Sequence, residues 1–278
     1  MSRTFLAPVA IAMSLGLAAC GTSALNFNKV EEIEFTDLPP DQLYNEALVL
    51  MNEGQYKTAS LKFEEVDRLH PHTQWGRKSQ MMLAFTAYSQ GKYPEAINAG
   101  RRYLALHPNN EDAAYAQYII ASSYYKQIPD VTRDQAETRK ALDAFKVLLE
   151  KYPDSQYATD ARAKVLAAED QLAGKEMEVG RYYLERHDNL AAINRFKVVV
   201  EDYQQTRHVE EALFRLTESY YAIGLTQEAQ TAAAVLGHNF PNSKWYRDAY
   251  ALLEKGGYAP SENRSSWISR AMSHFKVL

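Results

Sequence analysis

The sequence has a single cysteine and no excess of basic residues. Among its 278 residues, 31 Lys and Arg stand against 35 Asp and Glu. A nucleic-acid-binding protein needs a concentrated basic surface, and this charge balance argues against that class. One cysteine also excludes a disulfide framework and a cysteine-ligated zinc site. The 46% of hydrophobic residues excludes disorder of the whole chain.

The motifs of common enzymes are missing as well. We find no Gly-rich phosphate loop, no Gly-x-Ser-x-Gly elbow and no His-Glu-x-x-His pair. The seven histidines are scattered along the chain, and no pair of carboxylates stands out as a general acid and base. We therefore predict that the protein is not an enzyme and that it holds no metal and no cofactor.

The amino terminus has the pattern of a secretory signal peptide. Arg3 precedes an apolar run from Phe5 to Leu17, and small residues lead to Cys20. The run is too short for a lasting membrane span, so residues 1–19 are predicted to be removed. An ordinary signal peptide with an incidental cysteine is the alternative to the interpretation that follows.

Leu17-Ala18-Ala19-Cys20 resembles the bacterial lipobox. The resemblance implies that Cys20 carries covalent lipid, and several acyl chains anchor a protein stably. Gly21 stands where an inner-membrane retention signal would have Asp, which implies a lipid anchor in the outer membrane of a Gram-negative cell. The polar, acidic residues 20–40 end in Pro39-Pro40 and are predicted to form an extended tether.

Beyond residue 40 the sequence repeats. Four segments have small and bulky residues at offsets 0, 4 and 7, which lie on one helix face, and they are followed by Pro71, Pro108, Pro153 and Pro241. A fifth such segment, the fourth along the chain, has Gln204 in place of the proline. Proline prevents these helices from continuing, and Gly-plus-aromatic turns indicate another helix before each one. The unit of about 34 residues resembles the tetratricopeptide repeat. We predict an all-α solenoid of five helix-turn-helix units.

Two irregularities divide the predicted solenoid. Units one to three occupy 41–158 and contain an insertion at 127–134 that must form a loop. Units four and five occupy 159–255. No proline lies between Tyr157 and Arg186, so the first helix of unit four is predicted to be about fourteen residues longer than its counterparts, splaying the solenoid into halves.

The first helix of each pair is expected to line a concave groove rich in aromatic side chains. Tyrosine offers a large contact area and a polar group, which suits a groove for an extended peptide. The alternative is that these side chains pack between neighbouring helices. The candidates are Tyr44, Leu48, Met51, Met81, Phe85, Tyr88, Tyr115, Tyr118 and Tyr125.

The segment 256–278 is predicted to be a linker followed by a basic amphipathic helix. Trp267, Ile268, Ala271, Met272 and Phe275 fall on one helical face. Such a helix is typical of a partner-binding or membrane-surface element. Equally, it suits a cap over the apolar end of the solenoid. Its basic side chains are Arg264, Arg270, His274 and Lys276.

The order of these features resembles the BamD family, also called ComL or YfiO. The most specific segments are Tyr-Pro-Asp-Ser-Gln-Tyr-Ala at 152–158, Val-Gly-Arg-Tyr-Tyr-Leu-Glu-Arg at 179–186 and Ile-Asn-Arg-Phe at 193–196. The resemblance implies a non-catalytic lipoprotein scaffold on the periplasmic face of the outer membrane, within the β-barrel assembly machinery. Its implied partners are the barrel protein BamA, other Bam lipoproteins and unfolded outer-membrane proteins.

The resemblance also implies roles for particular residues. Arg195 matches the family's arginine in the helix that faces BamA, where it would form an ion pair with a POTRA domain, and Phe196 would supply packing beside it. The aromatic groove would receive the carboxyl-terminal signal strand of unfolded outer-membrane proteins.

Two other functions compete with this one. The first is a periplasmic adaptor for cell-division or peptidoglycan factors, because Phe240-Pro241-Asn242-Ser243 is similar to the repeat ending of the CpoB (YbgF) family. That family lacks a lipobox and usually begins with a coiled coil, whereas no apolar heptads precede Pro40 here. The second is a hydrolase in an unusual fold, for which we find no constellation.

Overall fold

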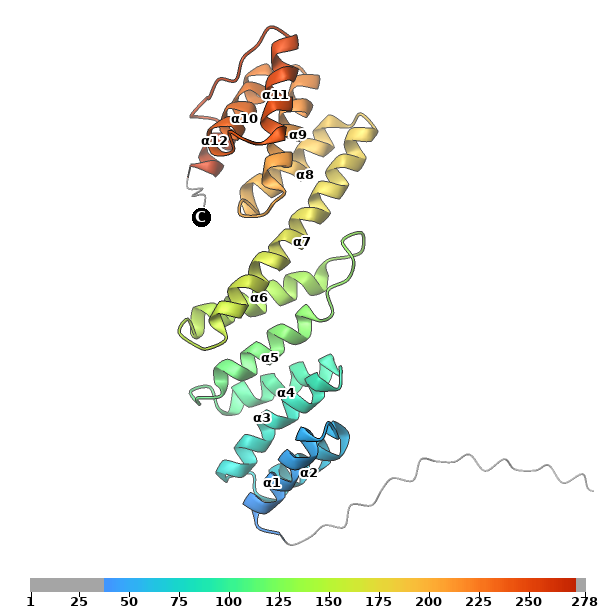
Figure 1. Cartoon of the computed structure of the whole chain (residues 1–278), viewed down its shortest axis with the longest axis vertical. Coiled ribbons are helices and arrows are strands. Elements are labelled where there is room, and N and C mark those ends of the chain that lie inside the picture. Colours follow the sequence, from blue (N-terminus) through green and yellow to red (C-terminus); the bar gives the residue numbers. More distant parts are fainter. Residues whose placement is uncertain (1–37, 274–278) are drawn as a thin grey trace, which may run out of the picture. The chain divides into compact units, whose positions relative to one another are not determined.

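A computed structural model describes residues 38–273, a part of the chain that contains twelve α-helices and no strand. Ten of the helices form five successive pairs (Figure 1). The first helices of the pairs are α1 (Pro40–Asn52), α3 (Gln74–Ser89), α5 (Ala113–Tyr125), α7 (Ala158–Glu185) and α9 (Val209–Ala222). The second helices are α2 (Tyr56–Leu69), α4 (Tyr93–Leu106), α6 (Ala136–Lys151), α8 (Asn189–Asp202) and α10 (Thr226–Asn239). After these come α11 (Lys244–Lys255) and α12 (Trp267–Met272).

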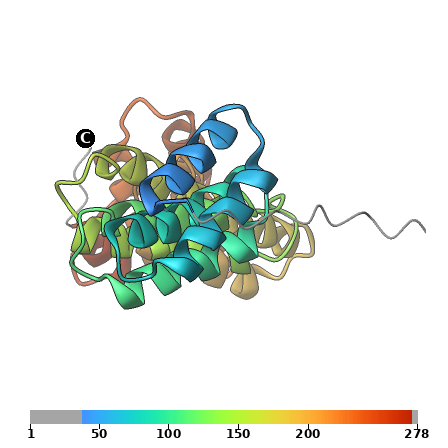
Figure 2. The same ribbon diagram turned by 90° about the horizontal axis from the view of Figure 1, so that it is seen from below.

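Each paired helix packs on the next one along the chain (Figure 1), and Figure 2 shows the same helices from below. First helices also contact one another, α1 with α3, α3 with α5 and α5 with α7. The core lies between the helices, where the small and bulky residues of the repeat are buried; Ala59, Phe63 and Val66 of the first unit have no exposed surface. The all-α solenoid of five helix-turn-helix units is therefore confirmed.

The second helix of every pair ends in the same turn. The residue after the helix has φ between −128° and −136° and ψ between 41° and 61°. Its carbonyl accepts a hydrogen bond from the backbone N–H three residues later, in the pairs His70–Thr73, His107–Asn110, Tyr152–Ser155, Tyr203–Thr206 and Phe240–Ser243. Proline follows this residue in four units and disfavours its α conformation. The fourth unit makes the turn with Gln204 in that position.

Positive backbone φ angles turn the chain between paired helices in four of the five units. Gly54, Gly91 and Gly224 have φ of 78°, 73° and 79°. In the fourth unit the corresponding residue is His187, with φ of 60°. Glycine adopts this left-handed conformation without steric cost, whereas histidine does not.

Helix α7 is 28 residues long, compared with 13 to 16 residues for the other nine paired helices. This confirms the long helix expected from the run without proline. The loop of unit three packs beside its middle: Gln171 donates a hydrogen bond to the Pro129 carbonyl and Lys175 to the Thr132 carbonyl. The insertion thus forms a loop, as expected, and is hydrogen-bonded to the long helix.

The carboxyl-terminal helix α12 covers the end of the repeat array. Ile268 is completely buried and Met272 is 4% exposed, both in the core that α8, α9 and α10 share. Trp267 donates its indole N–H to the Tyr220 hydroxyl, 3.1 Å away. The apolar face of this helix therefore packs against its own chain, which favours the cap over a membrane-surface or partner-binding element. Phe275, His274 and Lys276 lie outside the described residues.

Candidate partner-binding surfaces

A band of partly buried aromatic rings crosses the first helices α3, α5 and α7. Its members are Phe85, Tyr88, Tyr115, Tyr118, Tyr125 and Tyr157, and we call this surface the aromatic band. Tyr157 stacks on Tyr115 at 5.3 Å and on Tyr118 at 4.8 Å between ring centroids. Five of the six were predicted groove residues. Tyr157 was missed as a groove residue because it precedes its helix, although it lies in a motif typical of the family.

One ion pair stands within the aromatic band. Lys164 pairs with Asp160 one turn away on α7, and the Tyr118 hydroxyl donates to the same carboxylate at 2.7 Å. The Lys164 ammonium also lies 5.4 Å from the centre of the Tyr118 ring. This ion pair was not predicted; its only signal in the sequence is the i, i+4 spacing of opposite charges on a helix.

The local environment sets the protonation of these groups. Burial alone would raise the pKa of Asp160, but hydrogen bonds from Lys164 and Tyr118 outweigh it and lower that pKa. Burial would likewise lower the pKa of Lys164, and its bonds to Asp160 and Tyr118 raise it instead. Burial, followed by the neighbouring Tyr157, raises the pKa of Tyr115. At neutral pH the band therefore carries one balanced ion pair among neutral phenols, a surface suited to apolar side chains and backbone polar groups.

Two predicted groove residues do not belong to this surface. Tyr44 is 7% exposed and packs between the rings of Phe63 and Trp75, and Met81 is 1% exposed within the core of the second unit. Both side chains pack between helices because they lie on the side of their helix that faces the neighbouring pair. The prediction that they line an open groove was wrong.

The second candidate surface is centred on Arg195, in α8. Its guanidinium projects from the helix and pairs with Glu176 of α7 at 3.2 Å. Phe196 is completely buried and packs against Gly180. A direct contact between Phe196 and a partner is therefore excluded in this fold; the residue instead supports the helix segment from which Arg195 projects.

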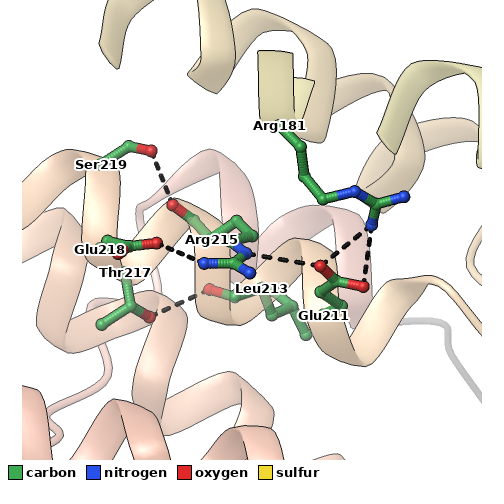
Figure 3. A network of polar contacts seen from close by, with 7 residues as sticks. All are labelled: Arg181, Glu211, Leu213, Arg215, Thr217, Glu218 and Ser219. Carbon is green, nitrogen blue, oxygen red and sulfur yellow. Dashed lines mark hydrogen bonds and ion pairs between the residues drawn. The ribbon is translucent and has the colours of Figure 1, made fainter. Parts of the chain in front are cut away.

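A polar network holds the end of α7 against α9 (Figure 3). Arg181 donates to both carboxylate oxygens of Glu211 at 3.0 Å. Glu211 also pairs with Arg215, which bonds Glu218 at 2.9 Å. The second half of α7 therefore contacts both α8, which carries Arg195, and α9, which carries Glu211.

Within residues 38–273, no helix is both long and apolar enough to cross a membrane, and no cluster of His, Cys, Asp or Glu could hold a metal ion. Cys20, the signal peptide and most of the predicted tether lie outside this range.

Serial helix pairs that pack each on the next define a helical-repeat protein. Residues 36–236 match the family model of YfiO, described as an outer membrane lipoprotein. The chain belongs to this family. The match favours a role in outer-membrane protein assembly over the cell-division adaptor and the hydrolase that were the alternatives.

Curated relatives carry a more specific name. The chain is 43% identical over 252 residues to outer membrane protein assembly factor BamD of Caulobacter vibrioides, covering 91% of this chain and 81% of that protein. It is 42% identical to the protein of the same name from Rickettsia prowazekii, covering 78% and 86%. Among solved structures, PilW, a type IV pilus biogenesis factor, is 16% identical with a TM-score of 0.35, covering 75% of this chain and 97% of PilW.

Proposed function

We propose that this protein is an outer membrane protein assembly factor that acts as a scaffold rather than as a catalyst. The observation that carries the proposal is the family match together with relatives of that name over most of the chain. In this function, lipid on Cys20 anchors the protein at the periplasmic face of the outer membrane, and residues 20–40 tether the helical repeats to it. Its partners are a BamA-type barrel protein, other Bam lipoproteins and unfolded outer-membrane proteins.

Docking on the POTRA domain of the barrel protein is assigned to the Arg195 surface. Arg195 is partly exposed and held by Glu176, so a partner carboxylate can replace or share that ion pair. Removing one member of a desolvated charge pair costs about 2 to 5 kcal/mol. Phe196 contributes indirectly, because its packing against Gly180 fixes the position of α8.

Binding of an extended peptide from unfolded outer-membrane proteins is assigned to the aromatic band. Partly exposed rings offer apolar contacts, and tyrosine hydroxyls tolerate the polar backbone of the peptide. Tyr118→Ala should weaken binding of a peptide taken from the carboxyl-terminal strand of a barrel protein, measured by fluorescence anisotropy. Tyr250→Ala, which removes an exposed tyrosine from α11, is the matched control. Equal binding by both variants would contradict the assignment.

Co-purification in mild detergent from the native envelope tests the docking surface. We expect a POTRA-bearing barrel protein with the wild type and with Glu176→Gln, which breaks the internal ion pair but keeps Arg195. We expect its loss with Arg195→Glu.

The double variant Glu176→Arg, Arg195→Glu restores an internal ion pair with reversed charges and therefore separates folding from docking. It should remain folded and still fail to recover the barrel protein. Recovery of the barrel protein by this variant would overturn the assignment of Arg195.

A further inference from the structure

A cavity of about 360 Å³ lies between the end of α10 and the segment that carries α12. From α10, His238 lines it; from the carboxyl-terminal segment come Glu262, Arg264, Ser269 and Arg270. None of these residues belongs to the Arg195 surface or to the aromatic band. The cavity thus sits apart from both surfaces assigned above.

The two arginines of this cavity have no carboxylate partner within the described residues. Elsewhere in this half of the chain, Arg181, Arg195, Arg207 and Arg215 each pair with a carboxylate at 2.9 to 3.4 Å. By contrast, Arg264 and Arg270 line the cavity, and their guanidinium groups make no hydrogen bond or ion pair with any residue from 38 to 273. Even Glu262, which lines the same cavity, forms no ion pair with them within this range.

A buried hydroxyl lies in the wall of this cavity. Ser269 is 8% exposed, and its Oγ is buried without a hydrogen-bond partner among the described residues. Because this atom has almost no accessible surface, it does not face the open space of the cavity. The donors that line the cavity are therefore the two guanidinium groups, neither of which has a partner within residues 38–273.

We infer that this cavity binds a phosphate group. Guanidinium groups match phosphate oxygens with paired, charge-assisted hydrogen bonds, and a tetrahedral phosphate has enough oxygens to accept from both arginines. The two arginines and Glu262 leave a net charge of +1 at the site, which favours an anion. The phosphate comes either from free phosphate or from the headgroup of an anionic lipid, which presents the same oxygens.

Isothermal titration calorimetry of the full-length protein with inorganic phosphate tests this inference. Arg264→Gln and Arg270→Gln should each weaken binding about tenfold or more, because each removes charged hydrogen bonds. Glu262→Gln should tighten binding, since it removes an acidic side chain that lines the cavity. Arg247→Gln removes an exposed arginine of α11 outside the cavity and should leave the affinity unchanged.

A second measurement distinguishes the two sources. Vesicles of phosphatidylglycerol and of phosphatidylcholine are sedimented with the protein and with Arg270→Gln. If the wild type sediments with phosphatidylglycerol vesicles and Arg270→Gln does not, the site binds a lipid headgroup. If the protein binds inorganic phosphate but does not sediment with these vesicles, the site binds free phosphate. The absence of phosphate binding at millimolar concentration, or equal affinities of the wild type and both arginine variants, would overturn the inference. Unchanged circular dichroism of the variants excludes misfolding as the cause.

Discussion

Histidine 187 occupies a backbone conformation that glycine adopts in three other units. Its φ of 60° is left-handed, and a side chain in this region costs roughly 1 to 2 kcal/mol. His187→Gly should therefore raise the free energy of unfolding by up to about 1 kcal/mol, because the greater entropy of unfolded glycine offsets part of the gain. Urea denaturation measures the change.

Gly91→Ala is the reciprocal control. Apart from its neighbours in the chain, no atom lies within 4 Å of the position that its Cβ would take, so a loss of stability comes from the φ of 73°. We expect a loss of about 1 kcal/mol. Opposite signs for the two substitutions would support the interpretation, and equal signs would refute it.

Glycine 180 is required by a close contact rather than by its backbone angle. A Cβ at this position would lie 2.4 Å from the ring of Phe196, which is completely buried. Gly180→Ala should destabilise the protein by about 1 to 3 kcal/mol through overpacking. Phe196→Leu in the same chain should recover part of the loss, and a double-mutant cycle by thermal denaturation measures the coupling. Additive effects would show that the contact is not responsible.

His208 makes stability depend on pH. Burial lowers its pKa, and the Asp170 carboxylate 3.8 Å away only partly opposes this. The unfolded chain therefore binds more protons as pH falls below about 6.5, and the free energy of unfolding decreases there. His208→Gln should reduce the loss between pH 7.5 and pH 5.5 in denaturant titrations. An identical loss in the variant would exclude His208 as its source.

Polar side chains along helix α7 connect it to the neighbouring elements. The loop of unit three contacts its middle, Glu176 pairs with α8, and Arg181 pairs with α9. At 28 residues, α7 is longer than α6 and α8, the helices of 16 and 14 residues that pack on it. These polar contacts therefore add to the apolar packing that joins α7 to the units before and after it.

Glu211 is the central acceptor of the network that joins α7 to α9. Glu211→Ala leaves Arg181 without its acceptor and should lower the free energy of unfolding by about 1 to 3 kcal/mol, as expected for a charged hydrogen bond. Glu210→Ala is the control, because it also removes a glutamate from the first turn of α9. A comparable loss in Glu210→Ala would assign the effect to the helix terminus instead.

The chain is stabilised mainly by contacts between neighbouring units, as expected for a repeat protein. Ile268 of α12 is completely buried on this array, and Ile268→Ala should cost about 2 to 5 kcal/mol. Hydrogen exchange should show the loss in α8–α10, on which α12 packs, and leave α1–α4 protected as in the wild type. Loss of protection in α1–α4 would show that the array unfolds as a single cooperative unit.

The sequence alone was sufficient to predict the helix pairs, the length of α7 and the loop of unit three. Local chemistry decides these features: proline after a helix, glycine in a turn and apolar residues at helical spacing act over a few residues. The turn at Gln204 is the exception, because it forms with the same backbone hydrogen bond although no proline follows Tyr203.

Which side chains stay exposed could not be predicted from the sequence, because packing between units decides it. Tyr44, Met81 and Phe196 share the repeat spacing with exposed positions, yet they are buried because adjacent helices cover them. Tyr157 enters the aromatic band from outside its helix, and Arg264 meets Arg270 at one cavity only because α12 folds back on α10. Periodicity specifies a helix face, whereas exposure depends on which residues distant in the chain pack over that face.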